Sequence, residues 1–195
     1  MRKTLILTST LTVAILTLTA AAPRAHDDAS SQPSREALPS VRVIDDATIV
    51  AIFDAANTAD IETGELAAQR GSSKEVRDFG AMLARDHKQV RQLGRDLAAK
   101  LGVTPTPPAD DASAKAHAAA MARLRALRGA SFDRAFLDHE VAFHQAVIDA
   151  IKSTLLPAIK NAELKELVVK VAPAFEAHRL AAQEMGKKLM ASRQK

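Results

Sequence analysis

Residues 72–102, SSKEVRDFGAMLARDHKQVRQLGRDLAAKLG, decide the fold that this sequence predicts. Their apolar positions recur every three or four residues, which is the period of an amphipathic α-helix. Ser72 and Glu75 match the S-x-x-E pattern that caps a helix N-terminus, and Gly102, followed by TPTPP, predicts the end of the helix. The apolar stripe runs through Val76, Phe79, Leu83, His87, Val90, Gly94, Leu97 and Leu101. This helix therefore turns one histidine toward its packing partners.

The same periodicity continues in three further segments, at about 45–70, 132–156 and 161–190. Very short turns near Gly71 and Ile159 join the four segments into two antiparallel hairpins. Between the hairpins, residues 110–129 form a shorter helical stretch, long enough at about 1.5 Å per residue to carry the chain back along the bundle. Two hairpins joined by a crossover that contains a short helix predict an all-α, ferritin-like four-helix bundle.

Capping residues and prolines set the expected limits of these helices. Asp45 or Asp46 caps the first segment, Ser131 caps the third, and Pro157 ends it. Pro173 lies inside the last segment, where its missing N–H predicts a kink. The stripe of that segment continues on both sides of the proline, through Leu164, Val168, Val171, Phe175, His178, Ala182, Met185 and Leu189.

Composition favours helices over a sheet. The 195 residues are 47% hydrophobic, which is enough for one domain with a real core. Only 3% are aromatic, with no Trp or Tyr, and alanine is abundant, a combination that suits closely packed helices. The chain also has no cysteine, so its stability must come from packing rather than from disulfide bonds.

The net charge of +4 does not indicate a nucleic-acid partner. Three of the 27 basic residues lie in residues 1–25, which contain no acid, so the remainder carries 24 basic and 23 acidic residues. Along the helices the charges alternate in sign, as in KEVRD, which is typical of solvated faces. We therefore expect no nucleic-acid binding.

The N-terminal sequence predicts export. Residues 1–25, MRKTLILTSTLTVAILTLTAAAPRA, have the basic start, apolar middle and small-residue end of a signal peptide. Residues 26–44 are polar and contain two prolines, which predicts a disordered leader. The bundle domain then spans 45–190, and 191–195 form a C-terminal tail. We expect a protein of the periplasm or cell envelope, with association with the outer membrane as one form of this localisation.

Polar residues at buried positions are the candidates for function. His87 and His178 lie on the apolar stripes of two helices, and Glu140 and His144, one turn apart, share a face of a third. Glu62 is the acidic candidate on the first helix. Each of the four helices thus offers a donor, which is how metal sites in helix bundles are built.

Distance from the hairpin turns indicates which donors are level with one another. Glu140 lies nineteen residues before the second turn and His178 nineteen after it, so these two and His144 form the best-placed group. Glu62 lies nine residues before the first turn and His87 sixteen after it, an axial offset of about 10 Å. Glu62 and His87 are therefore further candidates, as ligands or as groups that support the ligands.

A structural interpretation stands beside metal binding. An alanine-rich bundle tolerates a buried histidine whose ring nitrogen meets a single partner, and Glu140 with His144 also fits a surface pair. Asp86 either orients the neighbouring His87 or faces water and pairs with Arg85. The two interpretations differ in geometry, because a metal requires three donors about 2.0–2.2 Å from one point.

Sequence motifs narrow the chemistry. The chain has no glycine-rich phosphate loop, G-x-S-x-G, HExxH or CxxCH motif, so the sequence favours a protein without enzymatic activity. A di-iron carboxylate centre needs E-x-x-H on two helices, yet Ala84 and Phe175 stand three residues before His87 and His178. A donor set rich in imidazole suits copper, zinc or nickel better than iron or calcium.

Three stretches carry a resemblance to a known family: ADIETGELAAQRGSSKEVRDFGAMLARDH (59–87), FDRAFLDHEVAFH (132–144) and LKELVVKVAPAFEAH (164–178). Over about residues 45–190 the chain resembles domain of unknown function 4142, which is often described as a predicted outer membrane protein and grouped with ferritin-like folds. The resemblance places Pro173 on a recurrent proline and Phe136 where a tyrosine is more usual. It implies that the family's recurrent polar positions are Glu62, His87, His144 and His178.

The activity of that family is not established, so the resemblance informs the fold more than the function. The sequence favours an exported helical bundle that serves as a structural or stress-related envelope module. Its alternative is a periplasmic bundle that holds copper, zinc or nickel between its helices.

Overall fold

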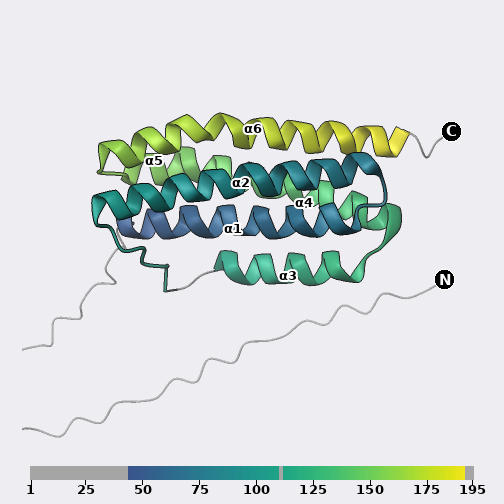
Figure 1. Cartoon of the computed structure of the whole chain (residues 1–195), viewed down its shortest axis with the longest axis horizontal. Helices are drawn as coiled ribbons and strands as arrows, with labels where there is room; N and C mark the ends of the chain where they lie inside the picture. Colours follow the sequence, from purple (N-terminus) through teal and green to yellow (C-terminus); the bar gives the residue numbers. More distant parts are fainter. Residues whose placement is uncertain (1–43, 110–111, 192–195) are drawn as a thin grey trace, which may run out of the picture. The chain divides into compact units, whose positions relative to one another are not determined.

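The computed structural model describes residues 44–109 and 112–191, and helices account for most of them (Figure 1). In chain order the elements are α1 (Asp46–Arg70), α2 (Lys74–Leu101), α3 (Ala112–Ala126), α4 (Gly129–Ala150), a π-helix (Ile151–Leu155), α5 (Leu156–Ala158) and α6 (Ala162–Ala191). None of the described residues lies in a strand. The predicted signal peptide, the leader up to residue 43 and the tail from residue 192 lie outside these ranges. Within them, no helix is both long and apolar enough to span a membrane.

Two antiparallel hairpins make up the bundle. Helix α1 packs along α2, α4 packs along α6, and the two hairpins meet through α1 with α4 and α2 with α6 (Figure 1). Helix α3 lies in the crossover and contacts α1 and α4. The predicted all-α, ferritin-like bundle with a crossover helix is confirmed.

Helices α1 and α2 of the first hairpin approach each other closely at two glycines. A Cβ atom on Gly64 would lie 2.7 Å from the carbonyl oxygen of Gly80, and one on Gly80 would lie 2.6 Å from the carbonyl oxygen of Gly64. Any larger residue at either position would push α1 and α2 apart. This contact fixes the register of the two helices close to the polar residues described below.

Each hairpin turn is clasped by a carboxylate from the other hairpin. Asp133 of α4 accepts hydrogen bonds from the backbone N–H of Ser72 (2.8 Å), the backbone N–H of Ser73 (3.1 Å) and the hydroxyl of Ser72 (2.6 Å). Asp46 of α1 accepts from the backbone N–H groups of Lys160 and Asn161, both at 2.9 Å. These reciprocal contacts hold the two hairpins side by side, one contact at each end of the bundle.

Some predicted helix limits are wrong by a few residues. Ser73, not Ser72, is the N-cap of α2, because the hydroxyl of Ser72 is already engaged by Asp133. Helix α4 begins at Gly129 without a side-chain cap, so Ser131 is not the cap. Pro157 does not end the helix, since it falls in the first turn of α5, where no N–H is needed.

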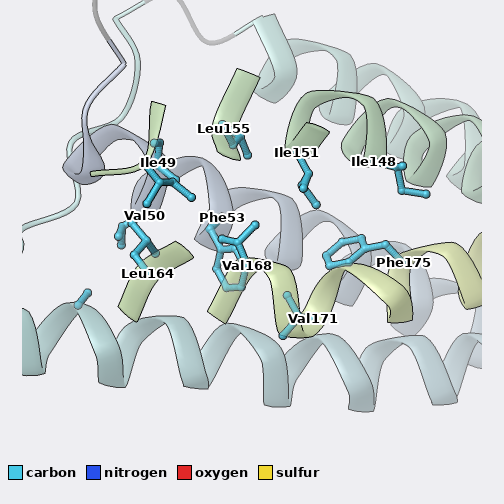
Figure 2. Close-up of a cluster of buried hydrophobic side chains, with 12 residues drawn as sticks. Ile49, Val50, Phe53, Ile148, Ile151, Leu155, Leu164, Val168, Val171 and Phe175 are labelled. Atoms are coloured by element: carbon cyan, nitrogen blue, oxygen red, sulfur yellow. The ribbon is translucent and has the colours of Figure 1, made fainter. Parts of the chain in front are cut away.

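The core consists of two apolar clusters. One lies toward the end that contains α5 (Figure 2) and comprises Ile49, Val50, Phe53, Ala98, Ile148, Ile151, Leu155, Ile159, Leu164, Val168, Val171 and Phe175. The other lies toward the α1–α2 turn and comprises Ala67, Val76, Phe79, Leu83, Leu124, Phe132, Ala135, Phe136, Leu137 and Ala182. On every long helix, a buried polar residue falls between the two clusters. The bundle therefore contains a polar layer halfway along its length.

Candidate metal centre

The polar layer draws side chains from all four long helices. Its histidines are buried, with exposed fractions of 1% for His87 (α2), 0% for His144 (α4) and 7% for His178 (α6). Their ring centroids lie 5.1 to 5.6 Å apart. The layer also contains Asn57, Asp60 and Thr63 from α1 and Glu140 from α4, each no more than 1% exposed.

His87 is oriented by an amide. The side-chain N–H of Asn57 donates to the carbonyl oxygen of Phe53 (2.8 Å), so the amide oxygen of Asn57 faces Nδ1 of His87 at 2.9 Å. That oxygen can only accept, so Nδ1 of His87 carries the proton. In the neutral ring, Nε2 is then left with a lone pair that points into the layer.

His144 is oriented by its own helix. Its Nδ1 lies 2.9 Å from the carbonyl oxygen of Glu140, one turn earlier, and therefore donates to it. Its Nε2 is buried without a hydrogen-bond partner and lies 3.9 Å from Oδ1 of Asp60. A second lone pair thus points into the same layer.

His178 is oriented from the edge of the bundle. Its Nε2 lies 3.4 Å from a carboxylate oxygen of Asp86, whose side chain is about one-third exposed and also pairs with Arg85 at 2.8 Å. The other ring nitrogen, Nδ1, faces Nε2 of His87 at 3.2 Å. Because Nε2 of His87 has no proton, either a proton or a metal ion must lie between these two nitrogens.

The separations between the inner nitrogens match a coordination shell. Two ligands bound tetrahedrally at about 2.0–2.1 Å from an ion lie roughly 3.3–3.4 Å apart. Two distances agree with this value: 3.2 Å from His87 Nε2 to His178 Nδ1 and 3.5 Å from His87 Nε2 to Asp60 Oδ2. The others are wider, since His144 Nε2 lies 3.9 Å from Asp60 Oδ1 and the three histidines offer ring nitrogens within 4.8 Å of one another. The side chains, His144 in particular, would therefore have to move inward to close around one ion.

A pair of carboxyl groups lies beside the histidines. All four carboxylate oxygens of Asp60 and Glu140 are buried, and no residue that the structure describes forms a hydrogen bond with them. Asp60 faces the inner nitrogens of His87 and His144, whereas Glu140 Oε2 lies 3.4 Å from Nδ1, the outer nitrogen, of His144. Asp60, Glu140 and His144 also form a group whose donor atoms lie within 4.8 Å of one another.

Burial changes the ionisation of every group in the layer. It lowers the pKa of His87 to about 2, helped by His144 and His178, and that of His144 to about 4, helped by His178. It also lowers the pKa of His178, against the attraction of Asp86. Burial raises the pKa of Glu140 to about 7, although the polar side chains of Thr63 and Asp60 beside it oppose the shift. The imidazoles are therefore neutral at pH 7, the form that binds metals.

Asp60 has a raised pKa as well, because of burial and then because of its neighbour Glu140. Two carboxyl groups in contact cannot both ionise cheaply without a cation, so one proton stays on the pair near neutral pH.

The structure brings three of the five residues that the sequence singled out as ligands into one group, His87, His144 and His178, and places a fourth, Glu140, in an adjoining group with Asp60 and His144. It does not bring in Glu62, which is exposed and lies 2.8 Å from His117 of α3. Glu62 follows Asp60 by two residues, about 200° around the helix, so the two side chains cannot share a face. The axial offset that the sequence predicts between Glu62 and His87 likewise argues against one ion binding both.

The sequence reasoning missed Asp60 and Asn57 as functional residues. Position 60 follows Phe53 by seven residues and position 57 by four, so both lie on the buried stripe of α1. An acid and an amide on an otherwise apolar stripe were the available signal. Asp86 supports His178 rather than its neighbour His87, because consecutive residues of a helix point about 100° apart.

Two solved structures have a similar fold. A DUF305 fragment from Deinococcus radiodurans matches 73% of this chain and 95% of its own, with 15% identity and a TM-score of 0.65. CopM in its Cu(II)-bound form matches 74% of this chain and 98% of its own, with 16% identity and a TM-score of 0.56. At these identities the likeness shows the fold alone. No curated protein matches the chain.

A family model covers most of the sequence. The match runs over residues 28–185, which include every long helix except the last residues of α6 and every member of the polar layer. The family is described as a domain of unknown function, so the match identifies relatives without an activity. The chain belongs to the DUF4142 family.

Proposed function

We propose that this protein binds a transition-metal ion at the centre of its bundle, through His87 Nε2, His144 Nε2, His178 Nδ1 and Asp60. One observation carries the proposal. Each histidine has its outer nitrogen beside a fixed oxygen acceptor and its inner nitrogen directed at the others. Outer acceptors that set the ring tautomer are the usual surroundings of metal-binding histidines.

Copper, zinc and nickel are the ions that this donor set suits best. Three imidazole nitrogens and a carboxylate oxygen match the ligand preferences of these metals, and calcium or magnesium would require more oxygen donors. The likeness in fold to a protein solved with Cu(II) supports copper as the first metal to test.

A purely structural role accounts for less of the geometry. For packing alone, one partner for each histidine would suffice, and the buried carboxylates would need donors of their own. Among the described residues, the carboxylate oxygens of Asp60 and Glu140, and Nε2 of His144, have no hydrogen-bond partner. A metal ion would bind Asp60 and His144 directly and would offset the charge of Glu140. We further propose that the protein acts in the periplasm or cell envelope, a proposal that rests on the signal-like sequence of residues 1–25.

Elemental analysis of the purified protein tests the proposal. The full chain is expressed without a histidine tag, purified without a chelator and analysed by mass spectrometry for copper, zinc and nickel. We expect about one ion per chain. The His178→Ala variant should lose the ion and keep its helical circular-dichroism spectrum.

The matched control is His117→Ala, which removes a histidine that lies outside the polar layer, beside Glu62. It should retain the metal of the parent protein. Equal metal content in the His178→Ala and parent proteins would contradict the ligand assignment. A parent protein that neither contains metal nor binds any on titration would contradict metal binding and favour the structural module.

A further inference from the structure

We propose that the carboxylate pair of Asp60 and Glu140 makes the centre selective for divalent over monovalent metal ions, with Glu140 as the residue that determines this selectivity. The inference rests on the proposed function and concerns which ions the same site accepts. For copper, it means that Cu(II) is bound in preference to Cu(I).

The first argument is the charge of the layer. Asp60 and Glu140 are 1% and 0% exposed, and their oxygens have no hydrogen-bond partner among the described residues. Every lysine and arginine within residues 44–109 and 112–191 is at least partly exposed, so no fixed cation in these ranges is buried with them. The histidines are neutral ligands. When both carboxyl groups are ionised, the positive charge that compensates them must therefore come from a bound cation.

A divalent ion supplies the charge that is needed. Two carboxylates and one dication form a neutral assembly. A monovalent ion is neutralised by one carboxylate alone, so the second carboxyl group, which can stay protonated, adds little to its binding. A dication beside a single carboxylate would keep an uncompensated positive charge, which is strongly unfavourable in a buried environment because the low local dielectric neither solvates nor screens it. Complete charge compensation thus favours the dication.

The second argument is the absence of thiolate. Monovalent copper and silver prefer soft sulfur ligands, thiolate above all. The chain contains no cysteine, and the polar layer offers imidazole and carboxylate donors. The donor atoms therefore favour the same ions as the charge does.

Asp60 and Glu140 have different roles toward the ion. Asp60 faces the inner nitrogens of His87 and His144 and is placed to coordinate the ion. Glu140 lies against Nδ1 of His144, the outer nitrogen of that ring. Its carboxylate acts on the ion through charge rather than through a bond, so its removal should change selectivity more than it changes the number of ligands.

The experiment compares Zn²⁺ with Ag⁺, two redox-stable ions of different charge. Affinities for the chelator-treated full chain are measured by competition titration in nitrate buffer, in which silver stays soluble. We expect Zn²⁺ to bind at least about 100-fold more tightly than Ag⁺ to the parent protein. Glu140→Gln should weaken Zn²⁺ binding by about tenfold or more and change Ag⁺ binding by less than about threefold.

The matched control is Glu62→Gln, which neutralises an exposed carboxylate on α1 and should alter neither affinity. Equal affinities for Zn²⁺ and Ag⁺ in the parent protein, or equal losses of both in Glu140→Gln, would overturn the inference and leave metal binding intact. If the parent protein binds neither Zn²⁺, Ag⁺ nor Cu²⁺, the proposed function fails and the inference fails with it. The parent comparison needs no variant, so it tests the inference even should Glu140→Gln not fold.

Discussion

Two regions of this bundle bury carboxyl groups, and they differ in how many hydrogen bonds those groups receive. At the α1–α2 turn, buried Asp133 receives three hydrogen bonds, two from backbone N–H groups and one from the hydroxyl of Ser72. In the polar layer, Asp60 and Glu140 are equally buried and receive none from a donor on the described chain. The same fold thus contains one satisfied acid and two unsatisfied ones.

This difference in hydrogen bonding separates a carboxylate that supports the fold, Asp133, from the carboxyl groups of the proposed metal site. The Asp133 clasp joins two hairpins and needs nothing beyond the polypeptide, as expected of a residue retained for folding. The polar layer is unfavourable for the protein alone, because it desolvates two acids and three imidazoles. Such local cost is typical of a site that is completed by a ligand. Removing a carboxylate should therefore have opposite effects on stability in the two regions.

The largest expected effect is a gain in stability from Glu140→Gln in metal-free protein. The pKa of Glu140 is raised to about 7, so the folded state keeps a proton that the unfolded state loses above its pKa near 4.5. This group therefore removes stability as the pH rises from about 4.5 to 7, on the order of 3 kcal/mol in total. Gln has no such penalty.

Urea unfolding at pH 4.5, 6 and 8 measures this effect. The free energy of unfolding of Glu140→Gln, minus that of the parent, should be near zero at pH 4.5, increase through pH 6 and level off above pH 7. Glu62→Gln, which removes an exposed carboxyl group from α1, is the control and should change stability little. A variant that is less stable than the parent at pH 8 would mean that Glu140 stabilises the fold, as Asp133 does.

Asp133→Ala should have the opposite sign. It leaves the N–H groups of Ser72 and Ser73 without their acceptor and unclasps the first hairpin, at a cost of about 2 kcal/mol. Metal affinity should stay within about twofold of the parent, because the clasp lies outside the polar layer. Denaturant unfolding and a metal titration of the same sample check both expectations.

The exposed Asp138 of the same helix provides the control, since Asp138→Ala removes a carboxylate from solvent. It should leave stability nearly unchanged. If Asp133→Ala abolished metal binding in a protein that remains folded, the clasp and the polar layer would be one coupled unit, and the comparison between them would fail.

The fold was predictable because helical periodicity is a local and repeated signal. The stripes of α2 and α6 each extend over about 25 residues, and the glycines and prolines between helices mark short turns. The exact caps were less predictable. By sequence Ser72 is the better cap, because only Ser72 has a glutamate three residues later, and it is the contact with Asp133, about sixty residues away, that leaves Ser73 in the role.

The candidate site was predictable in part. His87, His144 and His178 stand out because a histidine on an apolar stripe is conspicuous, and Glu140 shares a face with His144. Asp60 was hidden by the choice of Glu62 two residues later. Which nitrogen of each ring points inward depends on acceptors from other helices, such as Asn57, and no spacing rule within one helix gives that information.

Asn57 allows the finest test of the comparison, because in the proposed site it would act on the ion only through His87. Asn57→Ala removes the oxygen that holds the proton on Nδ1 of His87, so the ring can rotate or exchange tautomers. Copper or zinc affinity should fall about tenfold, the smallest effect proposed for the layer. Asn57→Asp restores an acceptor at the same position and should recover most of the loss, which a general packing defect would not do.

Thr58→Ala, on the next residue of α1, provides the control. The Thr58 hydroxyl donates to the backbone carbonyl of Asp54 outside the layer, so its loss should leave affinity unchanged. A full loss in Asn57→Asp would show that the amide serves packing, as Asp133 serves the turn, and would move Asn57 from the functional region to the structural one.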